Sequence, residues 1–272
     1  MTPVPATPAE EVFEYGDDAG QGFENQDMSD RKLPIIELLQ SNSPLVTSSK
    51  GKVFAGQFRN TVTGEVYEEV CFVPAITDHC FTEWVSRDDG GGFRGRHRKD
   101  AKIVMEAVAR NSGRAIGKLK VPQPSPDPDH ELVEGFEIYG ILYNPKDGEM
   151  LGFAMIPFTS TKIKVYRAWN SAIGNFAPVL GGKRLAPGQV PIFAHRVKMT
   201  SMAESKDKFT YMVPVLSPAE GDDLKSSLLP KSDVRYMAAK KLHDDVLNGL
   251  ARAAYETTEQ EAGPDPEGGV PF

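Results

Sequence analysis

The segment FTEWVSRDDGGGFRGRHRK, residues 81–99, gathers aromatic, glycine and basic residues more densely than any other part of the chain. Three consecutive glycines at 90–92 cost too much backbone entropy for a helix or strand interior, so they predict a loop. Basic side chains attract phosphates, and each base that stacks on an aromatic ring gains about 1–3 kcal/mol. The segment therefore predicts a surface that binds a nucleic-acid strand. The alternative is a solvated basic hairpin tip with Trp84 and Phe93 in the core.

Charge is distributed unevenly along the 272 residues. The formal net charge is −7, from 31 basic and 38 acidic side chains. Residues 1–30 hold eight of the acids and residues 256–272 hold five, and neither end has a Lys or Arg. The span 31–255 contains all 31 bases and the remaining 25 acids, so its charge is +6. Residues 93–120 are the most basic part, with nine bases and two acids, which is typical of an electrostatic footprint for phosphates.

Strand-like runs dominate the middle of the chain. Short apolar runs bounded by turn residues predict a hairpin and a third strand between residues 51 and 80. Further hairpins are predicted across the turns at 144–148 and 204–208. Pro74 lacks a backbone N–H, so it predicts that the third strand is an edge or ends there.

Two segments have helical periodicity. Residues 100–111 have apolar side chains at helical spacing, and Gly113 follows as a stop. A second helix is predicted from a cap at Ser232 to about residue 255. Its apolar stripe is Val234, Met237, Ala238, Leu242, Val246 and Leu250. Seven or eight strands with one inserted helix and a C-terminal helix predict a mainly β, α+β fold, an elaborated OB-like β-barrel with disordered acidic termini.

Composition divides the chain into four parts. Residues 1–30 are rich in Pro, Glu, Asp and Gly, which predicts a disordered acidic arm. Residues 31–220 are expected to form the OB-like nucleic-acid-binding domain, residues 221–257 the C-terminal helix, and residues 258–272 a disordered acidic tail with a protein-binding tip. The absence of a signal-peptide pattern and of an apolar run of about 20 residues, with only two cysteines, predicts a soluble, reduced, cytoplasmic protein.

A second basic and aromatic stretch is TSTKIKVYRAWN, residues 159–170. Interpreted as a strand, it places Lys162, Lys164 and Tyr166 on one side, and Arg167 joins them only if the strand ends or bulges. Nonspecific single-strand binders use such a row on an open barrel face; the alternative is a solvated strand face above a core Trp169. The predicted nucleic-acid-binding residues are Trp84, Arg87, Phe93, Arg94, Arg96, His97, Arg98, Lys99, Lys162, Lys164, Tyr166, Arg167 and Trp169.

The last eight residues, DPEGGVPF, resemble the tail of bacterial and phage single-stranded-DNA-binding proteins, a disordered acidic linker with a terminal Pro-Phe tip. The resemblance implies that Val270, Pro271 and Phe272 dock on a replication or recombination protein, in a pocket lined by apolar and basic groups. Gly268 and Gly269 replace part of the acidic run, which leaves the identity of the partner open. The alternative is an ordinary frayed end.

The body of the chain, about residues 33–215, resembles a family of phage-encoded single-stranded-DNA-binding proteins. The resemblance rests on FTEW with RDDGGGF, on FTSTKIKVYRAW and on PIFAHRVKMTS. It implies an oligonucleotide-binding barrel with long insertions, which works in phage DNA replication or recombination in the host cytoplasm.

Signals for an enzyme are weaker. Asp127, Asp129 and His130 suggest a metal-dependent nuclease, but they lie among prolines in a predicted loop. Cys71, His79 and Cys80 lack the paired spacing of a zinc site. The motifs of P-loop enzymes, zinc proteases and serine hydrolases are absent. We expect no catalytic residue, metal or cofactor, and single-stranded DNA as the partner. The remaining alternative is a virion structural or assembly protein whose basic patch meets an acidic neighbour.

Overall fold

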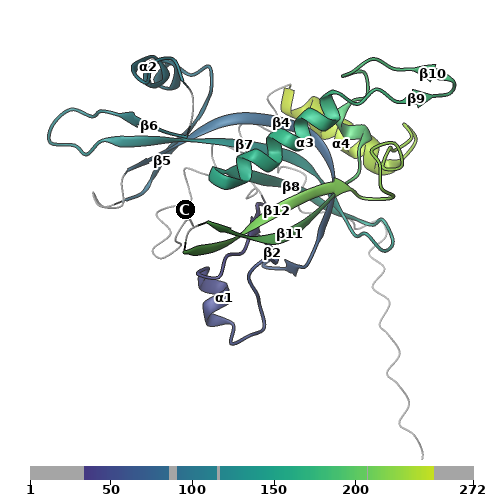
Figure 1. Ribbon diagram of the computed structural model, residues 1–272, viewed down its shortest axis with the longest axis horizontal. Coiled ribbons are helices and arrows are strands. Elements are labelled where there is room, and N and C mark those ends of the chain that lie inside the picture. The colour runs from purple at the N-terminus through teal and green to yellow at the C-terminus, as the bar shows by residue number, and fades with distance from the viewer. Residues whose placement is uncertain (1–33, 86–90, 115–116, 207, 248–272) are drawn as a thin grey trace, which may run out of the picture.

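Two long antiparallel strands, β4 (Val70–Val85) and β7 (His130–Tyr143), organise the fold. The computed structural model describes residues 34–85, 91–114, 117–206 and 208–247. One half of the β4–β7 pair belongs to a barrel. The other half extends to the left of Figure 1 as a four-stranded part of the same sheet, which we call the extension. The predicted mainly β, α+β class is confirmed.

The barrel has the strand order of an OB-like fold. β8 (Met150–Thr159) pairs with β7, while β11 (Val197–Lys206) pairs with both β4 and β12 (Phe209–Pro218). The order is therefore β8-β7-β4-β11-β12. Between β8 and β11 the chain passes through a 3-10 turn, η4 (Ser160–Lys162), and helix α3 (Ile163–Gly174). Five antiparallel-linked strands with a helix between the third and the fourth follow the Greek-key path of an oligonucleotide-binding barrel.

A short N-terminal strand, β1 (Ile36–Leu38), fills the seam between β8 and β12. Ile35 bridges Met155 of β8 in parallel. On the other side, the Gln40 amide donates to the Met212 carbonyl at 3.0 Å and accepts from the Met212 N–H at 2.8 Å. Beyond β1 lies a small second sheet made with β2 (Phe58–Asn60) and β3 (Val66–Tyr67), and helix α1 (Pro44–Ser48) connects β1 to β2.

Alternate residues of the barrel strands form its core. Phe72, Ile138 and Phe158 are fully buried there, and the Tyr166 and Trp169 rings of α3 complete the same cluster. The opposite face of β4 and β7 packs against helix α4 (Val234–Leu247) and the 3-10 turn η5 (Ile192–Ala194). The prediction that the C-terminal helix docks on the barrel is confirmed.

The extension adds three elements between β4 and β7. β5 (Phe93–Arg98) pairs with β4, β6 (Lys118–Val121) pairs with β7, and helix α2 (Lys102–Arg110) lies between them in sequence. The sheet order is β5-β4-β7-β6. α2 covers one face through a third apolar cluster. This cluster consists of Phe81, Val104, Ala107, Leu119, Val121 and Leu132.

Residues 160–174 form η4 and α3, so the strand predicted over residues 159–170 is wrong. Ile163, Tyr166, Trp169 and Ile173 are spaced for one helical face, and that face is buried. Burial of four large side chains in the barrel outweighs the β propensity of the first residues. The predicted single inserted helix is thus incomplete, because α1 and α3 also precede α4.

Two smaller expectations also differ from the structure. β4 neither ends at Pro74 nor is an edge strand, because it pairs with β7 on one side and with β11 and β5 on the other. Pro74 lies beside a bulge, where β7 is the only strand partner of β4 among the described residues. In α4, Asp233 rather than Ser232 caps the helix, because its Oδ1 accepts the Arg235 N–H at 2.9 Å. The buried face of α4 includes Tyr236 and Ala239 with Leu242, whereas Val234 and Met237 of the predicted stripe are exposed.

The β7–β8 and β11–β12 hairpins and α2 lie where the sequence analysis predicted them. None of the described helices has the length and apolar character needed to cross a membrane. The acidic arm at 1–30, the tail at 258–272 and Leu250 lie outside the described residues. Cys71 and Cys80 are both buried, free thiols.

Candidate nucleic-acid interface

The extension brings aromatic and basic side chains together on the face that α2 does not cover. Directly opposite residues of antiparallel strands share a face. Across β5, β4, β7 and β6, the register therefore places in one row Phe93, Trp84, Glu131 and Lys120. The next row is Arg96, Thr82, Val133 and Lys118, and Arg98 lies opposite Cys80. We call this surface the outer face. Its candidate binding residues are Trp84, Phe93, Arg98, Lys118 and Lys120.

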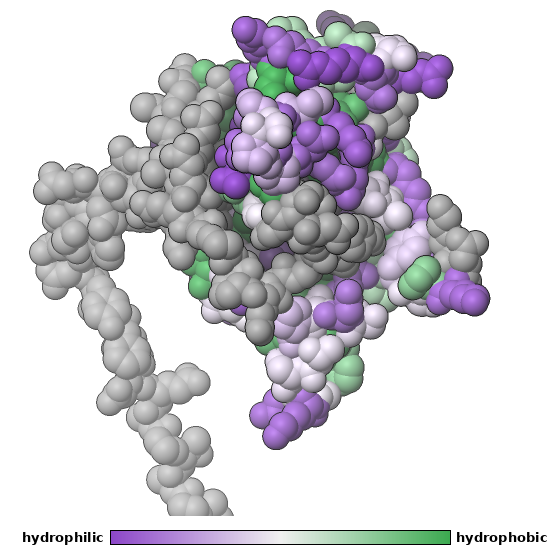
Figure 2. Space-filling view, turned by 90° about the vertical axis from the view of Figure 1, so that its left-hand side faces the viewer, coloured by the Kyte–Doolittle hydropathy of each residue, from purple (hydrophilic) through white to green (hydrophobic). Residues whose placement is uncertain are grey.

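The outer face is accessible except around Arg96 and Cys80, which are buried. Among the described residues, none of the three hydrophobic clusters has a member on it. Trp84 and Phe93 are half-buried and meet edge to face, with ring centroids 5.6 Å apart. Lys118 is exposed and lies 3.0 Å from Glu131, and Lys120 is exposed as well. Figure 2 views the molecule from the side of the extension, and the upper part of this view is mostly hydrophilic.

Arg96 has a structural position, which corrects its predicted role in phosphate binding. Its side chain is only 6% exposed and forms an ion pair with the Glu137 carboxylate, which is 8% exposed. It also donates to the Cys80 sulfur at 3.2 Å, and the Tyr139 hydroxyl donates to Glu137 at 2.8 Å. Because its charge is already neutralised and desolvated inside the sheet, Arg96 offers little to a phosphate.

His97 lies on the opposite face of β5, where it joins a three-residue cluster. Glu83 holds both neighbours: its Oε2 is 2.6 Å from His97 Nε2, and its Oε1 is 2.5 Å from His130 Nδ1. The cluster connects β5 and β7 through the carboxylate of β4. Burial raises the pKa of Glu83, but the hydrogen bonds from His130 and His97 outweigh burial, so its pKa lies below the ordinary value of 4.5.

The lowered pKa of Glu83 predicts how stability depends on pH. Because the pKa is lower in the folded than in the unfolded state, the carboxylate stabilises the fold above pH 4.5, and this contribution is lost as the pH falls through the folded pKa. Glu83→Gln should therefore be less stable than the wild type at neutral pH and approach it in acid. Urea unfolding at neutral pH and at a pH below 4.5 measures the difference in stability, with a substitution at an exposed site, Glu149→Gln, as control. An equal difference at both pH values would contradict it.

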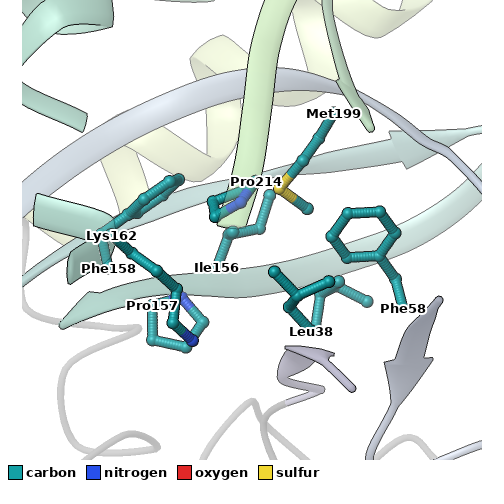
Figure 3. A pocket seen from close by; sticks show the side chains of 9 residues that line it. Leu38, Phe58, Ile156, Pro157, Phe158, Lys162, Met199 and Pro214 are labelled. Carbon is teal, nitrogen blue, oxygen red and sulfur yellow. The ribbon is translucent and has the colours of Figure 1, made fainter. Parts of the chain in front are cut away.

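Lys162 is not on an open surface. It lines a cavity of about 10 Å³ together with Ile156, Pro157, Phe158 and residues of β1 and β12. Figure 3 shows its side chain beside Phe158 and Pro157. Burial lowers its pKa, as expected for an ammonium group among apolar side chains. Lys162 therefore lies at the end of the barrel and not on the DNA-binding surface that the sequence predicted.

The other α3 residues lie on the face of the β4–β7 pair opposite to the outer face. Phe136 stacks on Tyr166 with ring centroids 4.5 Å apart, and Arg167 lies over Phe136 while bonding Glu134 at 2.9 Å. Lys164 is exposed but bonds Glu204 at 2.5 Å. Tyr166 and Trp169 are buried core rings, 5% and 7% exposed, so they offer no face for stacking. The two predicted basic segments do not form one continuous track.

The remaining predicted residues fall into two groups. Arg94 and Lys99 are exposed near the two ends of β5, where they can add charge to the rim of the outer face. Arg87 lies outside the described residues, and so do Val270, Pro271 and Phe272.

A hairpin tip that the sequence analysis did not single out is a further candidate. Phe209, at the start of β12, is 76% exposed, and the neighbouring Lys208 is exposed too. The β11–β12 tip points to the same side of the molecule as the extension (Figure 1). It corresponds to the loop between the fourth and fifth barrel strands, one of the loops with which OB folds contact oligonucleotides. In the sequence, this candidate could have been found from Phe209, an aromatic residue that directly follows the charged turn at 204–208.

Two of the residues named for the nuclease alternative have other hydrogen-bond partners. His130 bonds Glu83, and Asp129 accepts the backbone N–H of Gln123 at 3.3 Å. Across the described part of the chain, no three His, Cys, Asp or Glu side chains are grouped so that they could hold a metal ion.

The geometry defines a class: a mainly β protein in which an OB-like barrel supports a basic, aromatic sheet extension. The model of one family, Pam3 phage gp34-like protein, matches residues 5–251. The chain therefore belongs to the Pam3 phage gp34-like family and is a protein of phage type. No curated protein and no solved structure matches it.

Proposed function

We propose that this protein binds single-stranded DNA without sequence preference and works in phage DNA replication or recombination. The observation that supports this most strongly is the outer face, where two half-buried rings share one side of the sheet with the basic residues Arg98, Lys118 and Lys120. Rings without directional base-edge contacts bind any base, and lysine or arginine on either side attracts the phosphates. The family membership is consistent with a phage role.

Charge favours the same function. The bases of residues 93–120 all belong to the extension or its connections, and eight of the nine are exposed, Arg96 being the exception. The phosphate backbone supplies most of the affinity in nonspecific binding, so such a concentration of charge is suited to it. The apolar tip at 270–272, which follows the acidic run of the tail, is proposed to recruit a partner protein. No enzymatic activity, metal or cofactor is proposed.

Tryptophan fluorescence provides the direct test, because the two tryptophans occupy different environments. Trp84 lies on the outer face and Trp169 in the core. Titration with an oligothymidylate should quench the wild type. Trp84→Phe keeps a stacking ring, so it should still bind a labelled oligothymidylate in an anisotropy assay, but its remaining Trp169 should not be quenched. Quenching that persists in this variant, or no binding by the wild type, would overturn the proposal.

A charge variant tests the phosphate contact separately. Lys120→Gln should reduce the slope of log affinity against log salt by about 0.7, the value for one lost contact with a single strand. Lys146→Gln is the matched control, because Lys146 is exposed in the β7–β8 turn, away from the extension. Parallel titrations with duplex DNA and RNA determine the preferred strand. Equal slopes for the two variants would exclude Lys120 from the interface.

A further inference from the structure

A small ribbon projects from the barrel after α3. It consists of β9 (Val179–Leu180) and β10 (Lys183–Arg184), joined by Gly181 and Gly182. Both glycines have positive φ, 55° and 79°, as a tight two-residue hairpin requires. Figure 1 shows this ribbon extending beyond the rest of the molecule at the upper right.

The ribbon combines exposed apolar and basic side chains. Val179 is 46% and Leu180 is 37% exposed, and Lys183 and Arg184 next to them are exposed. A projecting β-ribbon with adjacent exposed aliphatic side chains is a surface that other chains readily cover.

A groove elsewhere on the molecule has apolar and acidic side chains that complement the apolar and basic side chains of the ribbon. It has a volume of about 770 Å³ and lies between α3, the β11–β12 hairpin and the loop at 222–224. None of residues 179–184 lines it, so the ribbon does not fill the groove of its own molecule. The apolar part of the lining includes Val165, Ala168, Ile173, Met202, Val215 and Leu216.

The groove has an acidic end. Of the charged residues that line it, Lys164 and Arg196 are basic, whereas Glu204, Asp222 and Asp223 are acidic. Both bases already have acidic partners, since Lys164 bonds Glu204 and Arg196 pairs with Glu220. The groove therefore favours an apolar segment with positive charge. The acidic residues 256–272 at the end of the chain have the wrong sign to fill it.

The edge of β12 limits how a partner could bind in the groove. The N–H and the C=O of Met212 both bond the Gln40 side chain, so both point away from β11. Backbone direction repeats every second residue along a strand, so Pro214 and Pro218 face the same way but have no N–H to donate. An added β-strand would find few partners along this edge, whereas side chains that insert between β12 and α3 need none.

We propose that the groove of one molecule receives the β9–β10 ribbon of a second copy of this chain. Val179 and Leu180 contact the apolar lining, and Lys183 and Arg184 approach Asp222 and Asp223. The ribbon and the groove are different surfaces of each molecule, so the contact is head-to-tail and can repeat along a row of copies. This proposal goes beyond DNA binding and does not depend on it.

Sedimentation velocity of the full chain without DNA tests the proposal. The wild-type mass should rise with concentration and fall again with added salt, because charge pairs contribute to the contact. A ribbon variant, Val179→Asp with Leu180→Asp, and a groove variant, Met202→Lys with Asp222→Lys, should each stay monomeric. All four side chains are exposed, so both variants should fold. Val62→Asp, also at an exposed valine, should associate like the wild type.

Mixing the two variants distinguishes this contact from a symmetric one. The ribbon variant retains an intact groove and the groove variant an intact ribbon, so an equimolar mixture should form a dimer and nothing larger. A wild type that stays monomeric at every concentration would overturn the proposal. So would a mixture that remains monomeric while the wild type associates, or association that is lost only when residues 263–272 are deleted. Since no DNA is present, any of these results leaves the proposed function untouched.

Discussion

Replacing Arg96 by leucine is expected to lower the free energy of unfolding by about 3–5 kcal/mol, because it leaves the buried Glu137 carboxylate without its cation. The double variant Arg96→Leu with Glu137→Leu should recover most of the loss, since it removes the uncompensated charge. Urea unfolding monitored by circular dichroism measures both.

Arg98→Leu is the matched control for this experiment. Arg98 lies two residues further along the same strand, and its side chain is 51% exposed. The same substitution at a surface site should change stability by no more than about 0.5 kcal/mol. If the two single variants lose similar stability, or if the double variant recovers none, the ion pair does not have the structural role assigned to it.

Trp169→Ala is expected to cost about 3–5 kcal/mol of stability, the usual range for truncating a large core ring. Trp169→Phe keeps most of the buried surface and should bind single-stranded DNA with wild-type affinity. Thermal unfolding measures the first effect, and anisotropy with a labelled oligothymidylate measures the second.

Trp84 should show the reverse pattern. Trp84→Ala removes a stacking ring from the outer face, so DNA affinity should fall by about 1–3 kcal/mol. Stability should fall less than in Trp169→Ala, because the Trp84 side chain is only half-buried. A Trp169→Phe variant that folds normally yet fails to bind single-stranded DNA would show that Trp169 takes part in the interface.

Hairpins and α2 were predictable because their signals are local. The apolar runs on either side of residues 144–148 and the stripe of α2 each occur within a short window of sequence. Residues 159–169 mislead because KIKVY alternates like a strand over its first residues, while Tyr166, Trp169 and Ile173 fit a helix. Extending the window to Ile173 favours the helix. Short apolar runs do not distinguish the two periods by themselves.

The candidate site was only partly predictable for a different reason. Alternation along β5 separates His97 from Arg96 and Arg98, but the strand register that adds Lys118 and Lys120 to the outer face depends on pairing across the extension. The Arg96–Glu137 pair joins residues 41 positions apart. Two opposite charges at such a distance in sequence give no local pattern, so composition identifies the basic patch but not which of its cations are already neutralised.

The seam at β1 has a consequence for biosynthesis. Gln40 meets Met212 across a separation of 172 residues. A ribosome must therefore complete nearly all of the barrel before its first and last strands can meet. Once β8 has been synthesised, β1 can lie against it through Ile35, but the other side of β1 stays open, and the barrel closes only when the final hairpin has left the exit tunnel.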